Sequence, residues 1–265
     1  MAVEQGVYPL GRCKTIHLVR HGEGTHNAAA DEVPNREDVP AVFFLEDYFD
    51  AELTDDGWSQ VDQRRMSVRE DGIFGGVELV VVSPLLRTLQ TAVGIFGGEG
   101  DVGESPPLMI EGAGNSNRPA ISNLNCKPFV AHELCREGME LHPCDRRRNK
   151  TYYVSLFPAV DFSLITDEED VLWNPERAET AQEIAARGVR FLKWLFTRPE
   201  KEIAVVSHGV FFYYTLGLFQ NECDEAVKRQ FSGRFHNCEL RSFVVVEKFI
   251  NNLEENLQNN GAGEE

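Results

Sequence analysis

The chain has 265 residues, of which 42% are hydrophobic and 26% charged, and its formal net charge is −17. A chain of this length buries one substantial core, which predicts a single α/β domain, and its acidic excess repels polyanions, so we expect no nucleic acid and no anionic membrane surface as a partner. No run approaches the roughly 18 apolar residues of a membrane helix and the first residues lack a signal-peptide pattern, which predicts a soluble protein of the cytoplasm.

The first half of the chain predicts alternating strands and helices. An uninterrupted β-branched run at 15–19 predicts a buried strand, an amphipathic segment at 55–68 predicts a helix, and a second buried strand is expected at 77–83. Another helix is expected at 85–96. The composition then shifts to Gly, Ser, Pro and Asn over 97–127, which indicates a long surface loop or insertion.

The second half continues the same alternation after an irregular stretch at 135–170. A helix is expected to begin after Asn174, which is a good N-cap, and to end before Pro199. Two further strands are predicted at 203–207 and 240–247, and their β-branched runs favour burial on both faces.

Together these elements predict a three-layer α/β/α fold with a mostly parallel central sheet and lid insertions. We expect one domain over 1–250, in which 97–127 and 135–170 are insertions and candidates for a lid over an active site. From residue 251 the chain is polar and acidic, and such a segment cannot bury enough apolar surface to order itself. Residues 251–265 are therefore predicted to be a disordered tail.

The strongest signal for chemistry follows the first predicted strand, where the chain reads RHGEGTHN at 20–27. Open α/β folds bind ligands at the carboxyl ends of their strands. The Arg20 guanidinium can bind two phosphate oxygens at once, and Gly22 and Gly24 let backbone N–H groups approach an anion closely. This segment predicts a phosphate-binding loop that includes His21.

Two further strand ends carry residues suited to phosphate. The second strand leads into SPLLRTLQTA at 83–92, which puts Arg87 in the first turn of a helix, where the helix dipole favours anions. The third leads into His208 and Gly209. Each feature alone has an ordinary structural explanation as a turn, a helix entry or a core histidine. Three of them at successive strand ends instead predict one anion site.

These segments resemble, in order and spacing, the signature of the histidine phosphatase, or phosphoglycerate mutase-like, superfamily, and the similarity spans residues 15–246. LTDDGWSQ at 53–60 fits the same pattern. Within the superfamily, HELCRE at 132–137 and HPCDRRR at 142–148 look like the plant and fungal phosphoglycerate mutase-like proteins. The resemblance implies a phosphoglycerate mutase-like α/β fold and a phosphatase that works through a phosphohistidine.

The resemblance also implies roles for single residues. His21 is the nucleophile, and Glu133 is the acid that starts protonated and gives its proton to the leaving oxygen, with His208 as the third catalytic residue. The residues implied to bind the phosphoryl group or substrate are Arg20, Asn27, Arg87 and Gly209. Without the resemblance, the sequence favours a solvated carboxylate as the interpretation of Glu133.

The physical chemistry of this set is coherent. Two guanidinium groups near His21 disfavour its imidazolium form, so the ring stays neutral and nucleophilic. The same cations neutralise charge that spreads over the phosphoryl oxygens in the transition state. No acidic residues with the spacing of a Mg²⁺ site accompany them. We therefore expect no metal and no other cofactor, and a small phosphate monoester such as a sugar phosphate as the substrate.

Two other functions remain open. A phosphoglycerate mutase-type phosphotransferase would pass the phosphoryl group from His21 to a second hydroxyl instead of water, but the chain lacks segments of the glycolytic mutases, which favours water. A catalytically silent phosphate-binding regulatory protein would keep the pocket, but it would need no nucleophile.

Two positions complicate the substrate prediction. Gly24 stands where the commonest pattern of the superfamily has Ser or Thr, which removes one hydroxyl contact to phosphate. Arg147, in the basic stretch 146–148, either recognises a second anionic group of the substrate or belongs to a solvated loop. The identity of the substrate and a homo-oligomeric state both stay open.

Overall fold

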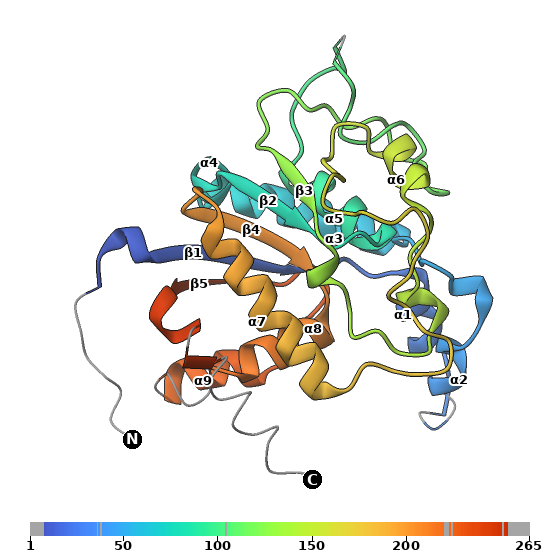
Figure 1. Cartoon of the computed structure of the whole chain (residues 1–265). Helices are drawn as coiled ribbons and strands as arrows, with labels where there is room; N and C mark the ends of the chain where they lie inside the picture. Colours follow the sequence, from blue (N-terminus) through green and yellow to red (C-terminus); the bar gives the residue numbers. More distant parts are fainter. Residues whose placement is uncertain are drawn as a thin grey trace.

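The computed structural model describes residues 8–35, 37, 39–103, 105–219, 223, 225–250 and 252–253. At their centre lies a sheet whose strands follow one another in space as β3 (Phe129–Ala131), β2 (Leu79–Val82), β4 (Glu202–Ser207), β1 (Cys13–Arg20) and β5 (Leu240–Val246) (Figure 1). The first four strands pair in parallel, and β5 pairs with β1 antiparallel. The prediction of a mostly parallel central sheet is confirmed.

Helices connect these strands. The α-helices are α1 (Thr25–Asp31), α2 (Val39–Phe43), α3 (Asp55–Glu70), α4 (Ile73–Gly76), α5 (Leu86–Phe96), α6 (Lys150–Leu156), α7 (Ala181–Thr197), α8 (Gly209–Gly217) and α9 (Glu225–Ser232). Short 3₁₀-helices are η1 (Leu10–Arg12), η2 (Glu46–Tyr48), η3 (Glu133–Cys135) and η4 (Pro143–Asp145).

Two hydrophobic clusters cover the two faces of the sheet. Successive residues of a strand point to opposite faces, and in β2 Val80 joins a cluster with Leu89 of α5, whereas Val81 joins a cluster with Phe191 of α7 and Phe211 of α8. Figure 1 shows α7 and α8 crossing in front of the sheet, with α3 and α5 behind it. The three-layer α/β/α prediction is therefore confirmed.

The edge strands differ from their predictions. The prediction that 240–247 is buried on both faces is wrong, because β5 lies at the sheet edge and its Val244 is 68% exposed. The opposite edge strand, β3, was not predicted. It is three residues long, which is too short for a periodic pattern to identify.

The start of α7 was also predicted wrongly. The helix begins at Ala181 rather than after Asn174, with Thr180 as its N-cap. The Thr180 hydroxyl accepts a hydrogen bond from the Glu183 amide, and the Glu183 carboxylate accepts one from the Thr180 amide. The hydrogen bond from the Thr180 backbone, and then the one from the Arg177 side chain, lower the pKa of Glu183 to about 2. The Asn174 side chain instead accepts from the Glu176 amide in a turn before the helix.

The segments predicted as insertions both pack against the fold. Within 97–127, the side chains of Leu108 and Met109 are buried in the cluster that contains α5, so this segment is more than a surface loop. The stretch 135–170 carries η4 and α6. Of the tail predicted at 251–265, only residues 252 and 253 are described, and Leu253 is buried. The rest lies outside the described residues.

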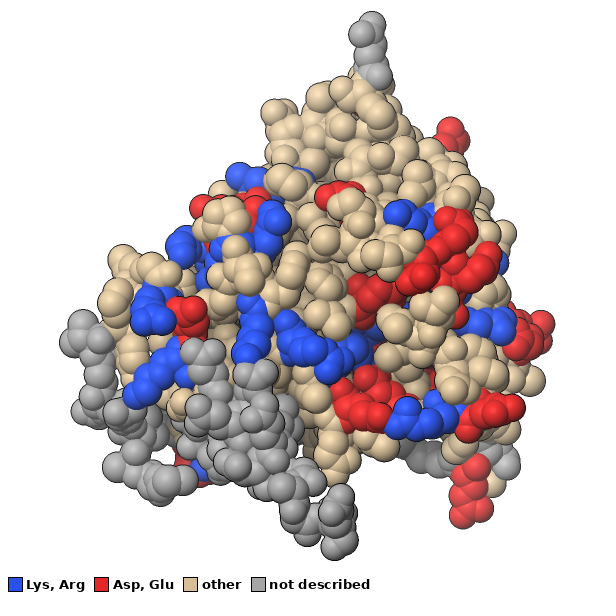
Figure 2. All heavy atoms as spheres, viewed as in Figure 1, with Lys and Arg blue, Asp and Glu red and all other residues tan. Residues whose placement is uncertain are grey.

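Charged side chains of both signs are mixed on the surface. Figure 2 shows Lys and Arg lying beside Asp and Glu over the face seen in Figure 1. Pairs such as Arg146 with Glu46 at 2.8 Å and Arg241 with Glu239 at 2.7 Å contribute to this mixing. Within the described ranges, no helix is long and apolar enough to cross a membrane.

The capping of α7 gives a test of the helix start. Thr180→Ala should lower the free energy of unfolding by about 1 kcal/mol. The Glu183 amide loses the hydroxyl that accepts its hydrogen bond, and the Glu183 carboxylate loses the hydroxyl that helps to hold it against the backbone amide of residue 180. Asn174→Ala should have a clearly smaller effect, because its turn precedes the helix. Urea unfolding of the two variants compares them, and a larger loss for Asn174→Ala would contradict the capping described above.

Candidate functional site

His21 directly follows β1, at the side of the sheet where the parallel strands β1, β2 and β4 have their carboxyl ends. Its amide donates to the Ser207 carbonyl across the β1–β4 pairing, at 3.0 Å, and its side chain is 2% exposed. The ring nitrogen Nδ1 lies 2.7 Å from the Gly22 carbonyl oxygen. Because a carbonyl can only accept, Nδ1 carries the proton and Nε2 keeps its lone pair.

The loop after His21 depends on close backbone packing. A Cβ atom on Gly22 would lie 2.8 Å from the Gly57 carbonyl oxygen, so only glycine fits there. The Gly22 amide donates to the Thr91 hydroxyl of α5 at 3.0 Å. The loop is thus held between the start of α3 and the middle of α5. This packing fixes the position of the neighbouring imidazole.

Two arginines from different strand ends act on His21. Arg20 is the last residue of β1 and donates to the Phe235 carbonyl at 2.7 Å. Arg87, in the first turn of α5, is 1% exposed and donates to the Cys144 carbonyl at 2.6 Å and to Asp145 at 3.3 Å. Burial, followed by the positive charges of Arg87 and Arg20, holds the pKa of His21 well below its ordinary value. The ring is therefore neutral near pH 7.

His208 and Gly209 come from the end of β4, as predicted. His208 is the N-cap residue of α8, and its ring lies edge-on to that of His21, with centroids 5.1 Å apart. Its Nε2 is 2.8 Å from the Ser83 hydroxyl at the end of β2. A Cβ atom on Gly209 would lie 3.4 Å from Nε of Arg20, so the glycine packs directly against that guanidinium.

Four buried nitrogen atoms around His21 lack a hydrogen-bond partner. Among the described side chains, these are Nε of Arg20, Nδ1 of His26, Nε of Arg87 and Nδ1 of His208. Buried polar atoms without partners are rare in folded proteins. Four in one cluster, two of them on guanidinium groups, form a site that suits an anion.

Glu133, the predicted acid, has two cationic partners. It begins η3, after the N-cap residue His132 that follows β3, and its two oxygens accept from Arg136 at 3.2 Å and from Arg147 at 2.7 Å. Each oxygen thus accepts a hydrogen bond from a guanidinium group. The role of Glu133 as the acid stays a prediction.

Glu137 lies four residues further on, and our sequence reasoning missed it. It is partly buried, and its Oε1 accepts from the amides of Phe211, at 2.9 Å, and Gly138, at 3.0 Å, at the start of α8 beside His208. Burial and then the nearby Asp145 carboxylate raise its pKa. Of the nearby carboxylates, Glu137 is also the one that raises the pKa of Arg20 most. Its only signal in the sequence was a second glutamate in HELCRE.

Asn27 has a structural partner within its own loop. Its Oδ1 accepts from the Gly24 amide at 3.1 Å and so caps the start of α1. The predicted phosphate contact would have to use its amide nitrogen. His26, the residue before it, is buried at 5% exposure and faces His21 with ring centroids 6.0 Å apart.

Arg147 is a buried structural cation, which does not fit its predicted contact with substrate. It is 3% exposed, and all five guanidinium N–H donors are used, because Nε bonds Glu133 and the two terminal nitrogens bond four backbone carbonyls. Those carbonyls belong to Asp167, Glu168, Glu169 and Arg148. No donor is left for a ligand.

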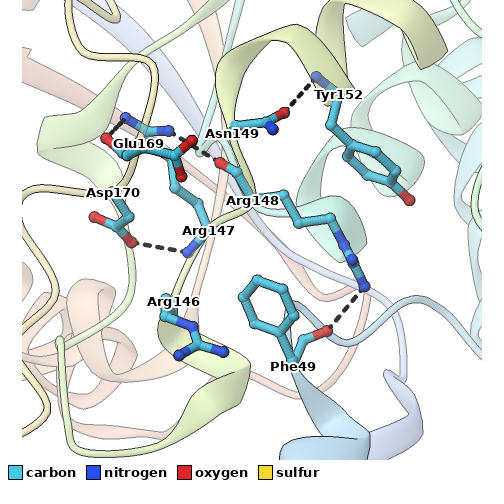
Figure 3. A pocket seen from close by; sticks show the side chains of 8 residues that line it. All are labelled: Phe49, Arg146, Arg147, Arg148, Asn149, Tyr152, Glu169 and Asp170. Carbon is cyan, nitrogen blue, oxygen red and sulfur yellow. Dashed lines mark hydrogen bonds between the residues drawn. The ribbon is translucent and has the colours of Figure 1, made fainter.

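The neighbouring arginines border a separate pocket of about 420 Å³ (Figure 3). Arg146 and Arg148 lie on either side of the Phe49 ring, with guanidinium carbons 4.2 and 4.6 Å from its centroid. Arg148 also stacks on Tyr152 at 4.9 Å. Of the basic stretch, Arg146 and Arg148 therefore remain accessible to a ligand and Arg147 does not.

Metal ligands do not gather in this site. Within the ranges that the structure describes, no group of three or more His, Cys, Asp or Glu side chains could hold a metal ion. The expectation of a metal-free reaction stays a prediction.

Curated proteins of similar sequence are found in plants and fungi. The chain is 55% identical over 245 residues to phosphoglycerate mutase-like protein 1 of Arabidopsis thaliana, covering 92% of this chain and 85% of that protein. It is 54% identical to a second Arabidopsis phosphoglycerate mutase-like protein, covering 92% and 88%. A Candida albicans phosphomutase-like protein is 28% identical over 77% of this chain and 59% of its own length. No family model matches the chain.

Solved structures of similar fold are more distant. A putative alpha-ribazole-5'-P phosphatase from Escherichia coli matches with a TM-score of 0.48 at 17% identity, covering 89% of this chain and 92% of that one. A phosphoserine phosphatase mutant from Entamoeba histolytica, in complex with phosphoserine, matches with a TM-score of 0.46 at 16% identity, covering 88% and 94%.

The buried role of Arg147 can be tested directly. Arg147→Met should lower the free energy of unfolding by about 3–5 kcal/mol, because it leaves Glu133 and four carbonyls short of a partner. Arg148→Met, at a half-exposed neighbouring position, should cost far less. Thermal unfolding followed by circular dichroism measures both. A stable Arg147→Met protein that discriminates less between charged and neutral substrates would restore the recognition role.

Proposed function

We propose that this chain, which belongs to the phosphoglycerate mutase-like proteins of the histidine phosphatase superfamily, is a phosphatase that hydrolyses a small phosphate monoester through a phosphohistidine on His21. One observation carries the proposal. A neutral imidazole whose Nε2 keeps its lone pair lies beside buried nitrogens that have no partner, on Arg20, Arg87 and His208. A phosphoryl group is the ligand that satisfies both features, since it accepts hydrogen bonds and is open to nucleophilic attack.

The first half-reaction forms a covalent enzyme. Nε2 of His21 attacks phosphorus, the bond from phosphorus to the alcohol oxygen breaks, and the leaving oxygen takes a proton from an acid. Arg20 and Arg87 stabilise the charge that builds on the phosphoryl oxygens, and they do so without reorganising because backbone carbonyls already hold them. His208 can donate through Nδ1 when its Nε2 accepts from Ser83.

The second half-reaction restores the enzyme. A water oxygen attacks phosphorus, the phosphorus–nitrogen bond breaks, and its electron pair returns to Nε2 of His21. The proton that the water loses goes back to the acid of the first step. A second hydroxyl in place of water would make the enzyme a mutase, so the acceptor decides between the two activities.

Glu137 is our candidate for that acid. Burial and Asp145 raise the pKa of Glu137, so this carboxyl keeps its proton at higher pH than an ordinary glutamate. It lies at the start of α8, beside His208 and Gly209. Glu133, in contrast, is paired with two guanidinium groups. We assign Glu133 to holding Arg136 and Arg147 in place.

The nucleophile is tested by trapping. Wild-type protein treated with EDTA and mixed with p-nitrophenyl phosphate should release phosphate and, when quenched with base during turnover, carry an acid-labile, base-stable phosphoryl label. His21→Ala should lose both. Turnover that persists in His21→Ala would refute the proposal, and turnover that requires a bisphosphate primer and an acceptor sugar would favour the mutase.

The acid is tested by varying the leaving group and the pH. Glu137→Gln should slow hydrolysis of an alkyl phosphate by about 10²–10⁴-fold and that of p-nitrophenyl phosphate much less, because nitrophenolate leaves without a proton. In wild type, kcat/KM for the alkyl phosphate should fall as pH rises through the raised pKa of Glu137, since the active form is protonated. Glu137→Gln should lose that limb.

Glu133→Gln is the matched control for this experiment. It should reduce stability and affect both substrates equally. A leaving-group dependence in Glu133→Gln, with none in Glu137→Gln, would return the acid role to Glu133.

A further inference from the structure

We propose that His26 is a third imidazole of the phosphoryl site, whose Nδ1 forms a hydrogen bond to an oxygen of the bound phosphate group. This inference rests on the proposed function and adds a substrate-binding residue to it. The motif at 20–27 did not single out His26, because a histidine in a short helix reads as an ordinary core or surface residue.

The first support is an unpaired buried nitrogen. The His26 side chain is 5% exposed, and its Nδ1 is buried without a hydrogen-bond partner. Two rings lie near it: Phe43 is edge-on with centroids 6.1 Å apart, and His21 lies at 6.0 Å. A histidine kept only for packing would leave this nitrogen uncompensated, at a cost of about 1–3 kcal/mol.

The second support is the electrostatic environment of His26. Its pKa is lowered well below the ordinary value by burial and then by the charges of Arg87 and Arg20, the same two cations that act on His21. His26 therefore lies in the same electrostatic environment as the nucleophile. A neutral imidazole there has one N–H donor to offer, and it adds no further positive charge to the cluster.

The third support is Gly24, which makes room for the ring. A Cβ atom on Gly24 would lie 2.7 Å from Cε1 and 2.8 Å from Nδ1 of His26. The backbone at Gly24, with φ −96° and ψ 160°, is one that any residue adopts, so the conformation does not require glycine. It is the close approach of the His26 imidazole that requires glycine at this position. The lack of a side chain at Gly24 therefore leaves the space that the His26 ring occupies.

The experiment measures binding of inorganic phosphate by calorimetry, which does not depend on turnover. His26→Phe fills the space without a hydrogen bond, and it should weaken phosphate binding by about tenfold or more, the loss of one hydrogen bond to a charged group. Gly24→Ala keeps the imidazole but displaces it, and it should weaken binding comparably. His26→Gln, which keeps a side-chain donor, should retain part of the affinity.

His17→Phe is the matched control. His17 is also buried, but both of its ring nitrogens have partners, Ser242 at 2.7 Å and Glu202 at 3.1 Å. This variant should lose thermal stability with unchanged phosphate affinity. If His26→Phe and Gly24→Ala behave like His17→Phe, with lower stability and phosphate affinity within about twofold of wild type, the inference is overturned and His26 is structural.

The outcomes separate this inference from the proposed function. Should His21→Ala still turn over substrate, the phosphohistidine mechanism fails, while the phosphate affinities of His26→Phe and Gly24→Ala still decide the contact. Should those affinities match wild type while His21→Ala is inactive, the mechanism stands without His26.

Discussion

Parallel pairing of β4 with both β1 and β2 brings three strand ends to one edge of the sheet, and the site depends on this pairing. The amide of His21 continues the ladder by donating to Ser207, and the Ser83 amide does the same toward Val206. His21 and Ser83 thus hold their positions through backbone hydrogen bonds of the sheet, and His208 follows directly as the N-cap of α8. Side chains set on such a rigid edge need little further support to keep the geometry that phosphoryl chemistry requires.

The chain segment between β3 and α7 closes the other side of the site through charge pairs. Asp170 accepts from two nitrogens of Arg136, at 2.6 and 2.8 Å, and from the amide of Arg147 at 2.8 Å. Arg136 is fully buried, and its pKa is raised well above the ordinary value, with the Asp170 carboxylate as the main stabilising cause. Arg136 also donates to the Asp145 carbonyl at 2.6 Å, so these bonds tie the residues that deliver Cys144 and Asp145 to Arg87 to the stretch that follows η3.

The sequence predicts the parts of this molecule that local patterns determine. Uninterrupted β-branched runs located β1, β2 and β4, and the polar residues after them located Arg20, His21, Arg87 and His208. The start of α7 was misplaced because Asn174-Pro175 and Thr180 both carry capping signals, and only the packing of the helix selects between them. The burial of Arg147 and the position of Glu137 were missed for a related reason. Whether an arginine is buried or a carboxyl is desolvated depends on segments that meet only in the folded chain.

The hydrogen bond from His21 to the Gly22 carbonyl has a stereochemical consequence. Because Nδ1 donates to this carbonyl at 2.7 Å, the imidazole can neither change tautomer nor flip its ring without breaking that bond. Any phosphoryl adduct on His21 would therefore be the tele isomer, attached at Nε2, and the regiochemistry of the intermediate would be dictated by one main-chain oxygen.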